Sequence, residues 1–232
     1  MVPIFRHPFT LIIAAPSNSG KSTLAFNIIK HSDQLLTSTS IAPQAKGFDS
    51  VWIIYQSTQP LYDRFRQELN IPVYLVSSGQ ENTLVQTLET QLKERQTSTP
   101  VILIDDGITH DNQQLIRDLF CRLGHHLSVS VILLCQSLFD SQNPTLRICH
   151  RNTKALIVFG CPRDQSSLRH LVYQMTPDRK KAASLIQAIV HELSVPYNYI
   201  LFDFHPECPP DQRYKTNILC ERGPYPICLC YK

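Results

Sequence analysis

A short polar segment ending in a lysine has the residue types needed to bind phosphate. Residues 15–23 are Ala-Pro-Ser-Asn-Ser-Gly-Lys-Ser-Thr, and they lie between an apolar run at 9–14 and a stretch with apolar residues at helical spacing. A tight turn from a strand into a helix directs backbone N–H groups at one point, where the helix dipole also favours an anion. Gly20 would let the turn close, Lys21 would reach the β and γ phosphates, and Ser22 would bind Mg²⁺.

This segment therefore predicts an ATP-binding loop. The usual pattern has Gly where this chain has Ala15, a difference of one methyl group at the end of the strand. The alternative is a chance Gly-Lys-Ser in a surface turn, and the strand before it and the helix after it argue against that. The residues expected to contact ATP are Ala15, Pro16, Ser17, Asn18, Ser19, Gly20, Lys21, Ser22 and Thr23.

Two aspartates follow the apolar residues 101–104. At the carboxyl end of a buried parallel strand they would lie beside the phosphate-binding loop. We expect Asp105 to hold Mg²⁺ through a water molecule and Asp106 to orient and deprotonate the attacking water. The alternative for Asp106 is that it only caps the turn at Gly107.

Polar and basic residues follow another apolar run, at 129–135. Gln136 comes at its carboxyl end, where it could sense the γ phosphate or position water, or could simply end the strand. Phosphoryl transfer spreads negative charge over the γ oxygens, which an arginine from a neighbouring subunit can stabilise. Arg151 is the first candidate for this role and Arg163 the second, ahead of Arg147.

Short apolar runs alternate with stretches of helical period, a pattern that predicts an α/β fold with a mostly parallel sheet flanked by helices. The expected strands are at about 9–15, 51–55, 73–77, 101–105, 130–135, 155–160, 199–204 and 215–221. The expected helices are at about 21–31, 60–69, 82–95, 112–124, 164–175 and 178–193. The last two strands should form a hairpin at the edge of the sheet, and residues 32–49 should form a surface loop.

Two expected strands, at 51–55 and 73–77, lie in the sequence between the loop and Asp105. This favours the class of P-loop NTPases that has an additional strand between the two motifs, the RecA- and FtsK-like class, over a nucleotide kinase. We expect a single domain over residues 1–232. Its core would cover about 5–165, and a helical and edge-strand elaboration would cover about 166–232.

Composition sets weaker limits on function. A net charge of +3 and a pI near 8.4 are compatible with a phosphate-rich partner without demonstrating one. No apolar run approaches the roughly 18 residues of a membrane span, and no signal peptide opens the chain, so a soluble intracellular protein with reduced thiols is expected. The C-terminal cysteines and histidine lack the paired spacing of a zinc site; they are His205, Cys208, Cys220, Cys228 and Cys230.

Taken together, the phosphate-binding loop and the motifs that follow it resemble those of the genome-packaging ATPases of the FtsK/HerA superfamily. Within it, the chain looks most like the proteins of Polinton or Maverick elements, adintoviruses and similar DNA viruses with jelly-roll capsids. The resemblance covers about residues 5–221. Its motifs are residues 15–23, Leu-Ile-Asp-Asp at 103–106, Leu-Cys-Gln-Ser at 134–137, Arg-Asn-Thr at 151–153, Val-Phe-Gly-Cys-Pro-Arg-Asp at 158–164 and Tyr-Ile-Leu-Phe-Asp at 199–203.

The resemblance implies an ATP-driven motor, a homo-oligomeric ring that threads double-stranded DNA into a preformed capsid. It implies Gln136 as a sensor, an arginine finger acting between subunits, viral capsid proteins as partners, and a location in the nucleus or cytoplasm of an infected host with transient attachment to the capsid. Asp106 stands where the family usually has Glu, so which residue is the base is open.

DNA contact in such a motor would be independent of sequence, through phosphates. The densest basic run, Arg179, Lys180 and Lys181, could make it or could be an ordinary solvated helix face. Two other functions remain as alternatives. A cellular or plasmid translocase or helicase of the same superfamily would usually carry a further domain, for which this chain has no room. A scaffold that binds ATP without turnover is disfavoured by the intact lysine and aspartates.

Overall fold

A central β-sheet organises the protein. The computed structural model describes residues 3–37, 47–77, 86–87, 90, 98–105, 108–109, 112–140, 142–223 and 226–230. The nine-stranded sheet has the order β11-β10-β9-β8-β2-β7-β6-β4-β5. Its strands are β2 (Thr10–Ala14), β4 (Ser50–Tyr55), β5 (Val73–Ser77), β6 (Pro100–Ile104), β7 (Ser130–Cys135), β8 (Ala155–Phe159), β9 (Tyr199–Asp203), β10 (Tyr214–Thr216) and β11 (Ile227–Cys228).

The strands from β5 to β8 in this order are parallel, and β9, β10 and β11 continue the sheet as antiparallel strands. A separate parallel pair, β1 (Phe5–Arg6) and β3 (Leu36–Thr37), lies beside it. The prediction of a mostly parallel sheet with an antiparallel pair at its C-terminal side is confirmed.

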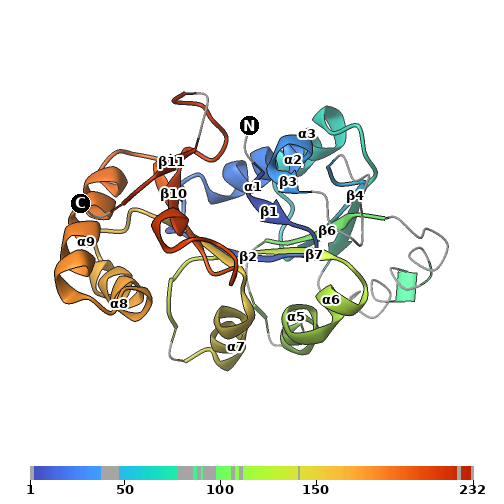
Figure 1. The fold of residues 1–232 in the computed structure, drawn as a ribbon. Helices are drawn as coiled ribbons and strands as arrows, with labels where there is room; N and C mark the ends of the chain where they lie inside the picture. Colours follow the sequence, from blue (N-terminus) through green and yellow to red (C-terminus); the bar gives the residue numbers. More distant parts are fainter. Residues whose placement is uncertain are drawn as a thin grey trace.

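Helices cover both faces of the sheet, as Figure 1 shows. In that view α1, α2 and α3 lie above it, and α5, α6 and α7 lie below it. The helices are α1 (Lys21–Lys30), α2 (Ser32–Leu35), α3 (Pro60–Glu68), α5 (Gln113–Asp118), α6 (Gly124–His126), α7 (Pro144–Asn152), α8 (Gln165–Met175) and α9 (Arg179–Leu193). No helix in the described ranges is both long and apolar enough to cross a membrane.

The central strands are apolar throughout because both of their faces are buried. Successive side chains of a strand point to opposite faces, so Leu11 and Ile13 of β2 join one apolar cluster and Ile12 joins the other. The cluster of Leu11 also contains Phe26 of α1 and Phe65 of α3, whose rings meet edge to face at 4.9 Å. The two helices that flank the candidate site are therefore fixed to the same face.

The order of the central strands decides the class of the fold. Strand β7 lies between β2, which leads into the phosphate-binding loop, and β6, which leads to Asp105. The prediction of an additional strand between the two motifs is confirmed. However, the prediction relied on the segments at 51–55 and 73–77, which form β4 and β5 and lie beyond β6. The inserted strand is β7, which follows Asp105 in the sequence.

Several expected elements differ from those observed. Part of the surface loop expected at 32–49 is instead packed structure, since α2 and β3 occupy Ser32–Thr37 and Leu35 is fully buried. Helix α7 was not predicted. The last expected strand ends at Thr216, because Asn217 turns the backbone with a φ of 53°.

The helix expected at 112–124 is interrupted by a π-helical turn at Leu119–Leu123. The helix expected at 82–95 lies largely outside the described residues.

Candidate nucleotide-binding site

The loop between β2 and α1 has the geometry of an anion-binding turn. Ala15 continues the pairing of β2, since its N–H donates to the carbonyl of Cys135 at 3.0 Å. The chain then turns through Asn18 and Gly20, which have φ values of 61° and 91°. The Ser19 hydroxyl donates to the Pro16 carbonyl at 2.6 Å and closes the turn on itself. The loop is therefore held by internal bonds while its tip faces outward.

Gly20, the N-cap of α1, has the left-handed conformation, which suits glycine because it has no Cβ. In the described chain no side chain caps this helix and no acidic residue lies in its first turn. Its first N–H groups are available to an anion, and no carboxylate within that turn competes for them. Lys21 and Ser22 are half-buried and Thr23 is exposed.

Ala15 is accommodated in place of the usual glycine. Its methyl group is 2% exposed and belongs to the apolar cluster under α1. The position lies before the left-handed part of the turn, so a Cβ causes no backbone strain there. This departure from the pattern leaves the loop geometry intact.

Asp105 lies at the end of β6 on the same face of the sheet as α1. It follows the alternation of Val101 and Leu103, which both pack in the cluster under α1. Its side chain is 2% exposed, and Oδ2 accepts a hydrogen bond from the Tyr62 hydroxyl of α3 at 3.1 Å. A buried carboxylate needs such a donor, and sequence reasoning did not identify Tyr62.

The register of the sheet sets Asp105 level with the loop. Ile104 of β6 pairs with Leu133, and Ala14 of β2 pairs with Cys135. Asp105 and the start of the loop therefore lie at the same edge of the sheet, on either side of β7. The structure brings these two predicted motifs together.

Cys135 lies between the two motifs, where a thiol could be mistaken for a nucleophile. Burial raises the pKa of Cys135 to about 12, although the charge of Lys21 acts to lower it. Its thiol donates to the carbonyl of Ser137 at 3.3 Å. Cys135 is therefore neutral at physiological pH and serves the site as packing.

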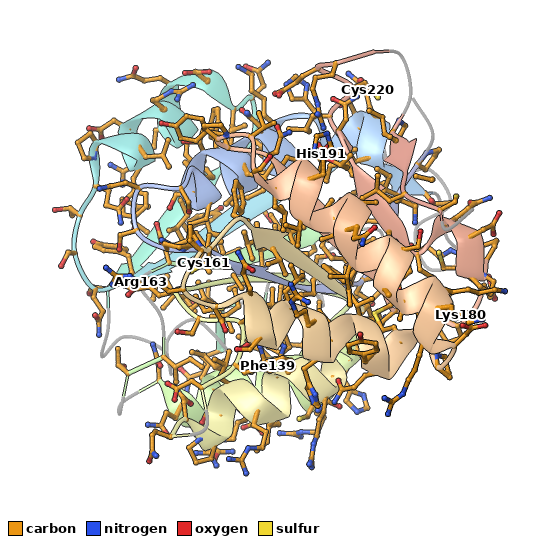
Figure 2. All side chains as sticks on the ribbon, turned by 90° about the vertical axis from the view of Figure 1, so that its left-hand side faces the viewer. Phe139, Cys161, Arg163, Lys180, His191 and Cys220 are labelled. Carbon is orange, nitrogen blue, oxygen red and sulfur yellow. The ribbon has the colours of Figure 1, made fainter. Side chains whose placement is uncertain are left out.

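Gln136 and Arg163 line one pocket beside the loop. The pocket has a volume of about 350 Å³ and also includes Ala15, Pro16 and Cys161 in its lining. Both Gln136 and Arg163 are exposed. Figure 2 shows Arg163 next to Cys161, at the end of the molecule opposite Lys180. Arg163 thus shares a pocket with the first residues of the loop in its own chain.

The other candidate arginines lie elsewhere. Arg147 and Arg151 are exposed residues of α7 and line a different groove, between α7 and α8, with Phe139 and His170. Arg151 does not line the pocket beside the loop. Arg151 therefore lies in a different groove from Arg163.

No protein-family model matches the chain, and no curated protein sequence matches it. The fold is similar to that of solved structures. The genome-packaging NTPase B204 of Sulfolobus turreted icosahedral virus 2, in complex with AMP, has a TM-score of 0.47 at 13% identity, covering 85% of this chain and 93% of its own. The DNA-packaging ATPase B204 of Sulfolobus turreted icosahedral virus has a TM-score of 0.48 at 14% identity, covering 85% and 94%.

The cytoplasmic domain of EssC has a TM-score of 0.44 at 14% identity, covering 69% of this chain and 33% of its own. Similarities at this level describe a distant likeness of fold and assign no activity. The interpretation of the site therefore depends on its own residues.

Asp106, the expected base, lies outside the described residues. The preceding residue, Asp105, is described. The backbone N–H of Asp105 donates to the carbonyl of Ile54 at 2.9 Å, so the pairing of β6 with β4 extends to Asp105. The role of Asp106 stays a prediction.

The basic run begins α9, far from the loop. Arg179, Lys180 and Lys181 are exposed, and the Asp178 side chain caps the helix by accepting from the N–H groups of Lys180 and Lys181 at 2.9 and 3.1 Å. Lys180 lies at the end of α9 opposite His191 (Figure 2). In the C-terminal tail, as in the rest of the described chain, no three His, Cys, Asp or Glu side chains gather in a group that could hold a metal ion.

Proposed function

We propose that the protein binds ATP at the loop between β2 and α1 and hydrolyses it. One observation carries this proposal. The turn after β2 and the buried carboxylate of Asp105 lie at the same edge of the sheet. In that turn a left-handed glycine directly precedes Lys21, where α1 starts without a side-chain cap. A phosphate chain fits that turn, because the N–H groups of α1 and the Lys21 ammonium both favour negative charge.

The residues present also fit Mg²⁺. This ion takes hard oxygen ligands and keeps several waters, so it needs few ligands from the protein. Ser22 would supply a hydroxyl ligand, and Asp105 would hold one of the bound waters. Among the described residues, Asp105 is the one carboxylate buried beside the loop, and one is enough for such a site. When bound, the ion would neutralise charge on the β and γ phosphates.

Hydrolysis needs a group to orient the attacking water. Asp106, directly after Asp105, is proposed as the base, and Gln136 is proposed to contact the γ phosphate or the water from the end of β7. Arg163 is proposed to stabilise charge from the same pocket, and Arg151 to do so from a neighbouring subunit. In each case the charge or donor would act on oxygens that become more negative in the transition state.

We further propose that ATP hydrolysis drives movement of double-stranded DNA into a viral capsid by a ring of these subunits. The series of motifs that resembles the packaging ATPases supports this, and so does the strand order with β7 between the two motifs. The basic run on α9 is proposed as one DNA contact. Three cations at a helix N-terminus are not favoured by the helix dipole, so helix stability does not explain their presence.

The test is the substitution Lys21→Ala, with MgATP binding measured by calorimetry and phosphate release measured with and without double-stranded DNA. We expect both binding and turnover to be lost. Lys30→Ala is the matched control, because Lys30 lies on the same helix, where it pairs with Glu68 at 2.7 Å, and should leave both unchanged. Normal hydrolysis by the Lys21→Ala protein would contradict the proposal.

Asp106→Asn separates binding from turnover. The variant should bind MgATP like the wild type and lose hydrolysis, because an amide cannot accept a proton from water. Full activity of Asp106→Asn would assign the base to another residue. Wild-type protein that binds ATP but shows no turnover, with or without DNA, would instead favour a nucleotide-dependent scaffold.

A further inference from the structure

Tyr197 lies over the phosphate-binding loop although it is far from it in sequence. It belongs to the connection between α9 and β9 and is 71% exposed, more than Tyr173 at 45%. A Cβ atom placed on Gly20 would lie 3.4 Å from Cδ1 of Tyr197. The ring therefore lies beside Gly20, the N-cap of α1, with a gap that one methyl group would fill, while most of the tyrosine surface faces solvent.

The backbone of Tyr197 is held in an unusual conformation. Its φ is 65°, in the left-handed region that a bulky aromatic residue rarely adopts. Unfavourable backbone conformations persist only where the surroundings impose them, and they are concentrated at ligand-binding positions. The packing of the ring does not account for this one, because the ring is exposed.

The turn that carries Tyr197 is braced from three sides. The next residue, Asn198, donates its N–H to the carbonyl of Val195 at 3.2 Å, and its side-chain amide donates to Glu192 Oε1 at 2.9 Å. The same Glu192 oxygen accepts from Arg222 at 2.5 Å and from the hydroxyl of Thr216 at 3.1 Å. Contacts from α9 and from the end of the sheet thus hold the backbone of the turn that carries the ring.

The strand order indicates which part of a nucleotide would reach this ring. Asp105 and Gln136, the groups proposed to act at the γ phosphate, follow β6 and β7 on one side of β2. The nucleoside must then extend toward the other side, over β8 and β9. Tyr199 pairs with Phe159 at the carboxyl end of β8, so Tyr197 lies at this edge of the sheet and on that side.

We propose that Tyr197 is the stacking surface for the base of the bound nucleotide. This inference rests on the proposed function of the loop. Every base presents a π face, so stacking on a tyrosine binds all nucleotides and favours the larger purines. The site should therefore prefer ATP and GTP over CTP and UTP without strong discrimination between the two purines.

The test compares Tyr197→Ala with the wild type, using calorimetry with MgATP and with magnesium tripolyphosphate, which has no base. MgATP should bind about tenfold more weakly to the variant, the loss expected for one stacked base, and tripolyphosphate should bind equally to both. Tyr197→Phe should retain MgATP affinity because it keeps the ring. Tyr173→Ala, which removes another exposed tyrosine, should change neither affinity.

A second measurement uses fluorescence. Tyr197→Trp should show quenching on addition of MgATP and none with tripolyphosphate, above the constant signal of the single native tryptophan, Trp52, which is buried at 5% exposure. Unchanged MgATP affinity in Tyr197→Ala, or an equal loss of MgATP and tripolyphosphate, would overturn the stacking role while leaving the phosphate site in place. Wild-type protein that binds neither ligand would overturn the proposed function itself.

Discussion

The Tyr62 hydroxyl donates a hydrogen bond to the buried carboxylate of Asp105. The tyrosine is 2% exposed, and its hydroxyl donates to a carboxylate that is equally buried. A hydrogen bond to a charged acceptor stabilises by about 1.5–3 kcal/mol. The donor also restricts the rotation of the carboxyl group, because it holds Oδ2 toward α3.

Tyr62→Phe removes only this hydroxyl and keeps the buried ring. We expect the free energy of unfolding in urea to fall by about 1.5–3 kcal/mol. The Mg²⁺ concentration needed for half-maximal ATPase activity should rise, because the carboxylate proposed to orient the metal-bound water is less fixed. Tyr55→Phe is the control, since its ring packs 5.4 Å from that of Tyr62 without a described bond to Asp105. An unchanged Mg²⁺ requirement would limit Tyr62 to a role in stability.

The parts of the candidate site that could be recognised in the sequence are those formed by residues close together in the chain. The turn before Lys21 and the carboxylate after β6 are both local patterns, because strand, turn and helix follow one another without a break. Tyr62 and Tyr197 reach the site from segments distant in sequence, Tyr62 being 43 positions from Asp105. Their types and spacing resemble those of ordinary packed or surface tyrosines, so only the folded structure reveals their contacts.

Among the elements, the C-terminal end of α9 packs against Gly160, the residue after β8, so closely that Gly160 could not carry a side chain. A Cβ atom on Gly160 would lie 2.3 Å from the backbone carbonyl oxygen of Leu193. This contact sets the height of α9 over the sheet and therefore the position of the turn that follows it. Because that turn carries Tyr197, the contact links the C-terminal helix to the phosphate-binding loop.

Gly160→Ala should force α9 away from β8. We expect a loss of about 1–3 kcal/mol in the free energy of unfolding, as for other overpacked positions, together with weaker MgATP binding. Ser184→Ala is the control, because Ser184 is an exposed residue of α9 and surface changes are usually within about 0.5 kcal/mol. A variant that is as stable as the wild type would show that α9 can shift without cost.

The first seven of the eight predicted strands, from 9–15 to 199–204, have nearly correct bounds, whereas helix α7 and the order of the strands were not predicted. A strand buried on both faces is apolar at every position, so β6 and β7 are distinct in the sequence. In α7 only Thr145, Leu146 and Cys149 are buried, a pattern too short to identify a helix. The order of strands is also absent from local patterns, which is why the inserted strand was assigned from the wrong segments.

At the scale of the whole molecule, stability should depend on pH through a buried histidine. His7 is 2% exposed, its Nδ1 lies 2.8 Å from Ser130 Oγ, and burial lowers its pKa from 6.5 to about 4. Asp49 acts to raise this pKa and Lys154 to lower it. Between pH 6.5 and 4 the unfolded chain therefore binds a proton that the folded protein excludes, and folding becomes less favourable as pH falls.

His7→Gln removes this titration and keeps a side chain that can bond Ser130. Measured by urea unfolding, the wild type should lose about 2 kcal/mol more than the variant between pH 7.5 and pH 5, since each unit of pKa difference corresponds to about 1.4 kcal/mol. Because the carboxylates titrate in both proteins, the comparison isolates His7. Equal pH profiles would mean that folding does not change the pKa of His7.

The positions of the two arginines lead to a prediction about the proposed ring. Arg163 lines the pocket beside the loop of its own chain, and Arg151 lies on α7 in a separate groove. If Arg151 acts across a subunit contact, co-expressing Arg151→Ala with Lys21→Ala should restore part of the ATPase activity that each variant lacks alone. An intact loop in one subunit then faces an intact Arg151 from the other.

Arg163→Ala should not be rescued in this way, because a loop that keeps Lys21 would still lack the arginine of its own chain. The measurement is the rate of phosphate release from the co-expressed pairs, compared with the sum of the single variants. Rescue of Arg163→Ala but not of Arg151→Ala would exchange the two roles. Rates equal to the sum for both pairs would mean that neither arginine acts between subunits, and that each active site is completed within one chain.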